Sequence, residues 1–198
     1  QIATSTGKVI HREYREKHSR QRSIDAALVG REISRFTASP NYMHNCGLGT
    51  FLMPICAIVV LWKGSELFAL LDALFAEKAD SVLLLLCVVL CGLASMNFMT
   101  APSVSLEGKS LWLLQSLPVE PRRIFKVKIR MQLLLTGLPL LLCIGCTAAV
   151  HPLHPMQMLM IFLFAGSYTL LMALVGLFFG VKMPTLTWTG EIMPIKQG

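Results

Sequence analysis

The chain has 198 residues, of which 54% are hydrophobic and only 15% charged, and its formal net charge is +7. Soluble domains carry about a quarter charged residues. This composition therefore excludes an ordinary soluble protein and predicts an all-α integral membrane protein. The charge is spread unevenly along the chain. It indicates orientation in a bilayer, and no nucleic-acid partner is expected.

Residues 1–30 form a polar, basic run without the apolar core of a signal peptide, and we interpret them as a cytoplasmic linker. The segment STGKV at 5–9 contains Gly-Lys, but position 2 is Ile2 and not the earlier glycine of a phosphate loop. The chain begins with Gln1 and ends in a polar tail at 182–198. We therefore expect a truncated piece of a longer protein.

Four apolar stretches follow, at residues 47–62, 81–100, 131–150 and 156–181. A helix needs about 20 apolar residues to cross the hydrocarbon of a membrane, and the last three stretches meet this length. The first is shorter and contains Pro54, which should kink it. It reaches full length if residues 41–46 add a turn at the interface. No charged residue or histidine lies inside the four stretches, so about four transmembrane helices are predicted.

The cations indicate the orientation of these spans, because Lys and Arg concentrate in cytoplasmic loops. Eight precede the first span and six lie in the 101–130 loop, whereas the 63–80 loop is mostly acidic and the 151–155 loop has none. The N-terminus, the 101–130 loop and the tail are therefore predicted to be cytoplasmic. The protein is expected in the plasma membrane as a multi-pass protein with both ends inside the cell.

The 101–130 loop is patterned. Residues 105–117 have helical character, Pro118 should end that helix, and Pro121 suits the first turn of a new one. Arg122, Lys126 and Arg130 follow at intervals of four, with Arg123 nearby. Such a stripe should face anions, either lipid headgroups or an acidic partner. The alternative is plain anchoring by positive charge. A short helix broken off by proline between two spans favours docking to a cytoplasmic partner.

Three segments resemble motifs of one family. SLEGKSLWLLQSLPVEPRRIFKVK at 105–128 resembles the S-x-E-G-K…W-x-L…L-P-V…K segment of the permease subunits of type-2 ABC exporters, particularly a group from Gram-positive bacteria. REISRFTASPNYMHN at 31–45 resembles that group's K/R-E-x-x-R-F-x-x-S-P-x-Y-x-x-N lead-in to a span. MPTLTWTGEIMPIKQ at 183–197 resembles its F-P-x-L-D-W-x-N-E…K-Q tail, with Thr187 and Gly190 departing from the pattern.

The resemblance implies a transmembrane permease subunit that couples a separate cytoplasmic ATPase to substrate efflux and has no ATPase activity or cofactor of its own. The implied partners are that ATPase, the lipid bilayer and a second permease half or copy. The residues expected to couple to the ATPase are Glu107, Gly108, Lys109, Trp112, Leu113, Leu117, Pro118 and Pro121. Glu107 and Lys109 are expected at the rim of that contact.

Residues 31–46 are expected to form an amphipathic elbow helix at the membrane interface, with the rings of Phe36 and Tyr42 among the headgroups. The expected interface residues are Arg31, Arg35, Phe36, Pro40, Tyr42, Arg122, Arg123, Lys126 and Arg130. The four-span membrane domain then occupies residues 47–181.

Other kinds of function stay open. A non-transporting membrane assembly protein predicts no transport. An ion-coupled carrier usually holds a charge at mid-depth, and a membrane-embedded enzyme needs a nucleophile, a metal cluster or a carboxylate pair. Cys143 and Cys146 have metal-ligand spacing but lie among leucines, and His151 with His154 provides too few ligands for a structural metal. No metal site is predicted.

Overall fold

The computed structural model describes residues 23–75, 80–108, 111–116, 118–188, 190 and 192–197. Within these ranges the secondary structure is helical, apart from one isolated β-bridge between Gly47 and Asn97. This confirms the all-α prediction. The helices are α1 (Ile24–Ala38), α2 (Pro40–Cys46), α3 (Leu48–Leu74), α4 (Asp80–Ser95), α5 (Thr100–Ser105), α6 (Leu111–Ser116), α7 (Pro121–Val150), α8 (Pro155–Lys182) and α9 (Ile192–Gln197).

Three of these helices, α3, α7 and α8, are long and apolar enough to cross a membrane. Each extends past the predicted apolar stretch. α3 continues to Leu74, beyond residue 62, and contains Pro54 within it. α7 starts at Pro121, ten residues before the expected span, with the proline in its first turn as predicted. The extensions of α3 and α7 include charged residues, whereas α8 exceeds its predicted stretch only by Pro155 and Lys182.

The stretch expected to span at 81–100 is interrupted. α4 ends at Ser95, residues 96–99 are not helical, and α5 begins at Thr100. Polar side chains hold this break. Thr50 donates its backbone N–H and its hydroxyl to Asn97 Oδ1, at 2.9 and 3.2 Å. Gln132 accepts from the Thr100 N–H and hydroxyl and donates to the Asn97 carbonyl, at 2.9, 2.8 and 3.0 Å. Backbone groups that lack a helical hydrogen bond at the break, such as the Asn97 carbonyl and the Thr100 N–H, thus find partners inside the protein.

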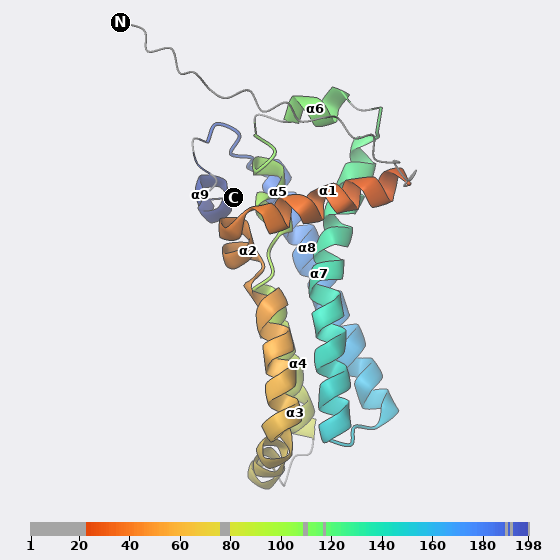
Figure 1. Cartoon of the computed structure of the whole chain (residues 1–198). Coiled ribbons are helices and arrows are strands. Elements are labelled where there is room, and N and C mark those ends of the chain that lie inside the picture. The colour runs from red at the N-terminus through yellow and green to blue at the C-terminus, as the bar shows by residue number, and fades with distance from the viewer. Residues whose placement is uncertain are drawn as a thin grey trace, which may run out of the picture.

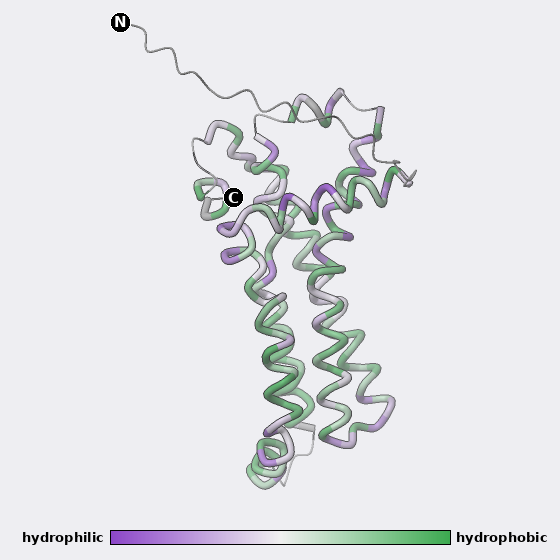
Figure 2. Tube along the Cα trace, viewed as in Figure 1, coloured by the Kyte–Doolittle hydropathy of each residue, from purple (hydrophilic) through white to green (hydrophobic). Residues whose placement is uncertain are grey.

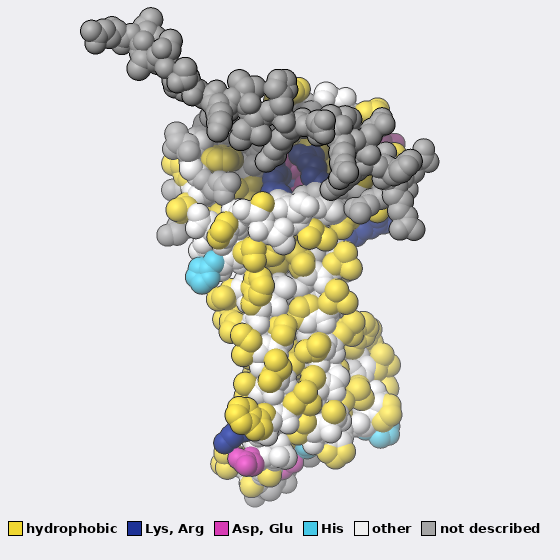
Figure 3. Space-filling model, viewed as in Figure 1, with side chains coloured by type: hydrophobic (Ala, Val, Ile, Leu, Met, Phe, Trp, Pro, Cys, Tyr) yellow, Lys and Arg dark blue, Asp and Glu magenta, His cyan; other side chains and the backbone are white. Residues whose placement is uncertain are grey.

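The long helices form a shaft. α3, α4, α7 and α8 run side by side along the long axis, and α1 crosses α7 near one end (Figure 1). Apolar residues dominate the shaft (Figure 2) and cover the face of it shown in Figure 3. Ile58, Leu138 and Phe178 are each at least 60% exposed. Such a continuous apolar exterior suits a protein whose surroundings are lipid.

The interior of the shaft is packed from all four helices. Met53 of α3, Leu90 of α4, Leu140 of α7 and Ile161 of α8 are all buried in one cluster. Cys143 belongs to this cluster and donates its thiol to the Met53 carbonyl at 3.0 Å. The cysteine therefore packs as a small apolar residue with a weak donor.

The two ends of the shaft differ. Helices α1, α2, α5, α6 and α9 gather at one end, which we call the junction end (Figure 1). At the other end, the turn after α7 contacts α3. The His151 ring stacks on Phe68 with centroids 4.8 Å apart, and His151 Nδ1 lies 3.8 Å from an Asp72 carboxylate oxygen.

The elbow segment differs from expectation. It consists of two helices, and α1 starts at Ile24, inside the stretch expected to be a linker. The side chain of Ser39 caps α2, and Pro40 occupies the first turn of that helix.

The rings of Phe36 and Tyr42 are only 2% and 1% exposed, so the expectation that both lie among lipid headgroups is corrected. They pack edge to face with centroids 5.2 Å apart, and Tyr42 donates its hydroxyl to the Met99 carbonyl at 2.6 Å. Burial raises the pKa of the Tyr42 phenol well above its ordinary value, which keeps it a donor.

Candidate functional site

A group of four charged side chains lies at the junction end, and we call it the ionic cluster: Glu32, Glu107 and Lys128, which are buried, and Arg35, which is partly buried. The ammonium of Lys128 lies 2.5 Å from Glu107 Oε1 and 3.4 Å from Glu32 Oε2. It also donates to the Ser103 carbonyl at 3.1 Å. The Lys128 side chain is only 1% exposed. A buried ammonium needs such partners because desolvation of an isolated charge is very costly.

Arg35 completes the charge balance. Its guanidinium lies 3.8 Å from Glu107 Oε1 and donates to the Leu106 carbonyl at 3.4 Å. Two cations therefore face two carboxylates. The members come from three places: Glu32 and Arg35 from α1, Glu107 from the turn after α5, and Lys128 from α7. The ionic cluster thus ties α1, the turn and α7 together.

The position of Glu107 corrects one expectation. The sequence suggested that Glu107 lies at the rim of a partner contact, but its side chain is 3% exposed and is paired inside the protein. A carboxylate at that depth holds the turn in place and is not available to a partner. Lys109, which was expected beside it, lies outside the described residues.

The turn at residues 105–108 is also held from the other side, by Trp188. The indole N–H of Trp188 donates to the Ser105 carbonyl at 2.8 Å, and the Thr185 N–H donates to the Ser105 hydroxyl at 3.0 Å. Gly108 has φ +36°, in the left-handed region that favours glycine. A Cβ added there would lie 2.7 Å from the indole nitrogen. Glycine is therefore required at this turn for both reasons.

The three segments that carry the family resemblance meet at this turn. Glu32 and Arg35 belong to the 31–45 segment, Glu107 and Gly108 to the 105–128 segment, and Trp188 to the 183–197 segment. The sequence alone does not predict this meeting, because the residues that bond to one another across the three segments lie some 70 to 80 positions apart in the chain. The residues that give each motif its character thus form one structural unit.

Helix α6 lies directly beyond the turn at the junction end (Figure 1). Leu114 is buried at 3% exposure and attaches α6 to the protein, whereas the Trp112 side chain is 67% exposed. The helix spans only Leu111–Ser116, so the expected helix over residues 105–117 is shorter and starts after a turn. Leu113 lies within α6, Pro118 is exposed after it, and Leu117 lies outside the described residues.

The basic residues at the start of α7 divide into two groups. Arg123 and Arg130 pair with the Asp25 carboxylate at 2.5 and 3.2 Å. These partners hold the pKa of Asp25 below its ordinary value, chiefly through the Arg123 hydrogen bond. Arg122 and Lys126 are exposed. An anion was expected opposite the basic stripe of α7. For Arg123 and Arg130 that anion is Asp25 of α1, a residue that the sequence analysis had placed in the linker.

The other expected interface residues lie on α1 and α2. Arg31 is half-buried on α1, and Pro40 is exposed at the start of α2. Arg35 points into the ionic cluster instead of serving only the membrane interface.

Sequence reasoning missed Lys128. It was counted among the cations of the loop, yet it lies on the face of α7 opposite Lys126 and Arg130. Met131 and Gln132 are buried on that same face. The spacing of Lys128, Gln132 and Thr136 at intervals of four is a signal of an inward-facing polar stripe, and all three are at most 2% exposed.

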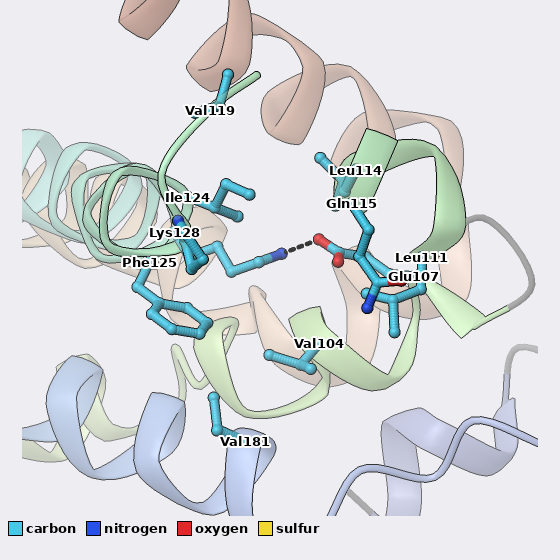
Figure 4. A pocket seen from close by; sticks show the side chains of 11 residues that line it. Val104, Glu107, Leu111, Leu114, Gln115, Val119, Ile124, Phe125, Lys128 and Val181 are labelled. Atoms are coloured by element: carbon cyan, nitrogen blue, oxygen red, sulfur yellow. Dashed lines mark ion pairs between the residues drawn. The ribbon is translucent and has the colours of Figure 1, made fainter. Parts of the chain in front are cut away.

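A cavity of about 390 Å³ lies beside the ionic cluster. Its walls come from α5, α6, α7 and α8, and Lys128 and Glu107 point toward each other across it (Figure 4). Most of its lining is apolar, with Val104, Leu111, Leu114, Val119, Pro121, Ile124, Phe125 and Val181 around the ion pair.

Compared with known proteins, the chain matches no family model, no curated protein and no solved structure. A function for the chain is therefore inferred from the chemistry and geometry of the junction end. Among the described residues, no group of three or more His, Cys, Asp or Glu side chains could hold a metal ion.

Proposed function

We propose that this chain is the membrane-embedded permease subunit of an ATP-driven exporter of the type-2 ABC class, and that α6 receives a separate cytoplasmic ATPase. One observation carries the proposal. The three segments that resemble this family converge on the turn at 105–108, and the next described element along the chain is the short helix that bears the exposed Trp112.

The ionic cluster supplies the connection that such a coupling requires. A partner that moves α6 also moves the turn, and the turn is joined to α7 through Glu107 and Lys128. Separating a buried charge from its partner costs about 3–5 kcal/mol. The pair therefore resists separation under load, so displacement of α6 reaches the helix that crosses the membrane.

The proposal includes a topology of four spans with both ends in the cytoplasm and with α1 and α2 as the elbow at the interface. The cation distribution supports this arrangement. The loops expected outside also meet at one end of the shaft, through the stack of Phe68 on His151. Cysteines placed at Ser65 and Pro152 should react with an impermeant reagent from outside the cell. One at Ser110, outside the described residues, should react only from inside.

The test of the proposal is recovery of the ATPase. Affinity purification of the full-length protein from its own cell membranes should recover a subunit with a phosphate-loop ATPase domain. Trp112→Ala should weaken that association by about 30-fold, since an aromatic hot spot contributes about 2 kcal/mol or more. The purified chain alone should hydrolyse no ATP.

Trp62→Ala is the matched control, because Trp62 is 82% exposed in the middle of α3, away from the junction end. It should leave ATPase recovery unchanged. Equal recovery with Trp112→Ala and wild type, together with normal transport, would instead assign Trp112 to the lipid interface as an anchor and would contradict the coupling role.

A further inference from the structure

We infer that the cavity beside the ionic cluster is a binding site for the acyl chain of an amphiphile that enters from the membrane. The cavity holds about 390 Å³, within the range of roughly 300–1,000 Å³ that is typical of small-molecule sites. Its walls are mostly apolar, and apolar cavities of this kind exclude water and accept hydrocarbon.

A second cavity adjoins this site on the outer surface of the shaft. It measures about 320 Å³ and lies against α8, and Phe125 and Val181 line both cavities. Phe178 in the second cavity is 60% exposed and Val181 is 45% exposed. The second cavity is therefore on the surface that lipid would cover, and a ligand would pass from it to the first by displacing the side chains of Phe125 and Val181.

The order of chemical groups along this path matches an amphiphile. Leu174 and Phe178 lie deeper along α8, toward the middle of the shaft, whereas Lys182 ends the helix and lies over the Phe178 ring at 5.6 Å. Beyond Val181 the path reaches the Lys128–Glu107 pair and the amide of Gln115. A hydrocarbon chain would therefore lie along α8, with its polar end toward the junction end.

The Lys128–Glu107 pair limits the charge that the polar end of the ligand can carry. Lys128 already has two carboxylates and the Ser103 carbonyl as partners. The site consequently offers no unpaired charge to attract a strongly anionic group, and affinity rests on the acyl chain. An acyl chain is present both in a phospholipid of the adjacent leaflet and in a free fatty acid.

Photolabelling distinguishes these two sources. The full chain is placed in nanodiscs without any ATPase, so that the result does not depend on the proposed function. One sample contains a phosphatidylcholine with a diazirine near the carboxyl end of its acyl chain, and another contains a fatty acid with a diazirine near its carboxyl end. After illumination, adducts are mapped by mass spectrometry. Label on Leu111, Leu114 or Ile124 is expected in at least one sample, because these side chains line the cavity.

Two substitutions close the site. Val181→Trp enlarges the wall that the two cavities share, and Val104→Phe fills the inner cavity from α5. Each should reduce label on the cavity residues several-fold. Val88→Trp is the matched control, because Val88 is 59% exposed on α4 and lines neither cavity. It should leave that label unchanged.

Label confined to the outer surface of the helices in both samples would overturn the inference, as would cavity label that neither filling variant reduces. Label from the phospholipid alone assigns the site to a bilayer lipid, and label from the fatty acid alone assigns it to a free amphiphile. Each of these two results supports an acyl-chain site. The two filling variants act from different helices, so a folding failure in one leaves the other to decide.

Discussion

The ammonium of Lys128 lies 2.5 Å from the carboxylate of Glu107, and both side chains are almost completely buried. Lys128 belongs to a helix long enough to cross a membrane, and Glu107 to the turn that leads to α6. Neither residue can be removed without leaving the other, or Glu32, as a buried charge with fewer partners. Several properties of the protein should depend on this contact.

Lys128→Met should lower the free energy of unfolding by about 3–5 kcal/mol, since it leaves Glu107 and Glu32 buried without their ammonium partner. Chemical denaturation in mixed micelles measures this change. Lys126→Met is the control, because Lys126 is exposed on the same helix, and it should stay within about 0.5 kcal/mol of wild type. The double variant with Glu107→Leu should lose less than the sum of the single losses, because the two side chains interact directly. Additive losses would contradict the coupling.

Gly180→Ala should destabilise the contact between α5 and α8. A Cβ at Gly180 would collide with the Ala101 carbonyl oxygen, which is backbone and cannot rotate away. Overpacking of this kind costs about 1–3 kcal/mol. Gly166→Ala on the same helix meets nothing within 4 Å, so it should be neutral or stabilise α8 by about 0.5–1 kcal/mol. Thermal unfolding of both variants in detergent checks this, and equal midpoints would refute the close approach.

Gly108→Ala should destabilise the turn beside the ionic cluster, since a left-handed residue with a side chain costs about 1–2 kcal/mol and the new methyl group would meet the Trp188 indole. Gly190→Ala, with nothing within 4 Å of its Cβ, is the matched control. Protease sensitivity between α5 and α6 should rise in the first variant only. An unchanged cleavage rate would show that the turn tolerates a side chain.

Asp25 should make the attachment of α1 to α7 sensitive to acid. Its pKa in the folded protein is lowered from 3.8 by Arg123 and Arg130. The stabilisation it provides is therefore fully present above pH 3.8 and is lost as the pH falls through the lowered folded value. Asp25→Asn should unfold at a lower temperature than wild type at neutral pH, and the two melting curves should converge in acid. A difference that persists at the lowest pH would assign the effect to something other than the carboxylate.

The sequence predicted the long apolar helices well because hydrocarbon length and the absence of internal charges are local properties of the chain. It placed the start of α7 at Pro121, since proline commonly occupies the first turn of a helix, and the start of the fourth span at residue 156, next to the first residue of α8. The break after Ser95 was missed because its stability comes from the side chains of Thr50 and Gln132, which lie far away in the sequence.

The candidate site was predicted only in part. Glu107, Gly108 and Arg35 were selected from the resemblance. The burial of the Glu107 carboxylate was not predicted, since it depends on Lys128, a cation of α7 that faces inward. Asp25 was overlooked because a single acidic residue in a basic run does not indicate which distant residues it will pair with. Phe36 and Tyr42 were assigned to the lipid because aromatic residues near a span commonly lie there. They are instead buried, because the two rings pack against each other and the Tyr42 hydroxyl donates to the Met99 carbonyl.

The two glycines of α8 that face α5 have a mechanical consequence. Side chains at an interface absorb small displacements by changing rotamer, but Thr100 and Ala101 rest almost directly on the α8 backbone at Gly176 and Gly180. α5 and α8 must then shift as one rigid body. α5 is also tied to α7, because Thr100 donates to Gln132 and Lys128 donates to the Ser103 carbonyl. A push on the turn after α5 would thus arrive at α7 and α8 together, so the two helices would translate as a pair instead of shearing past each other.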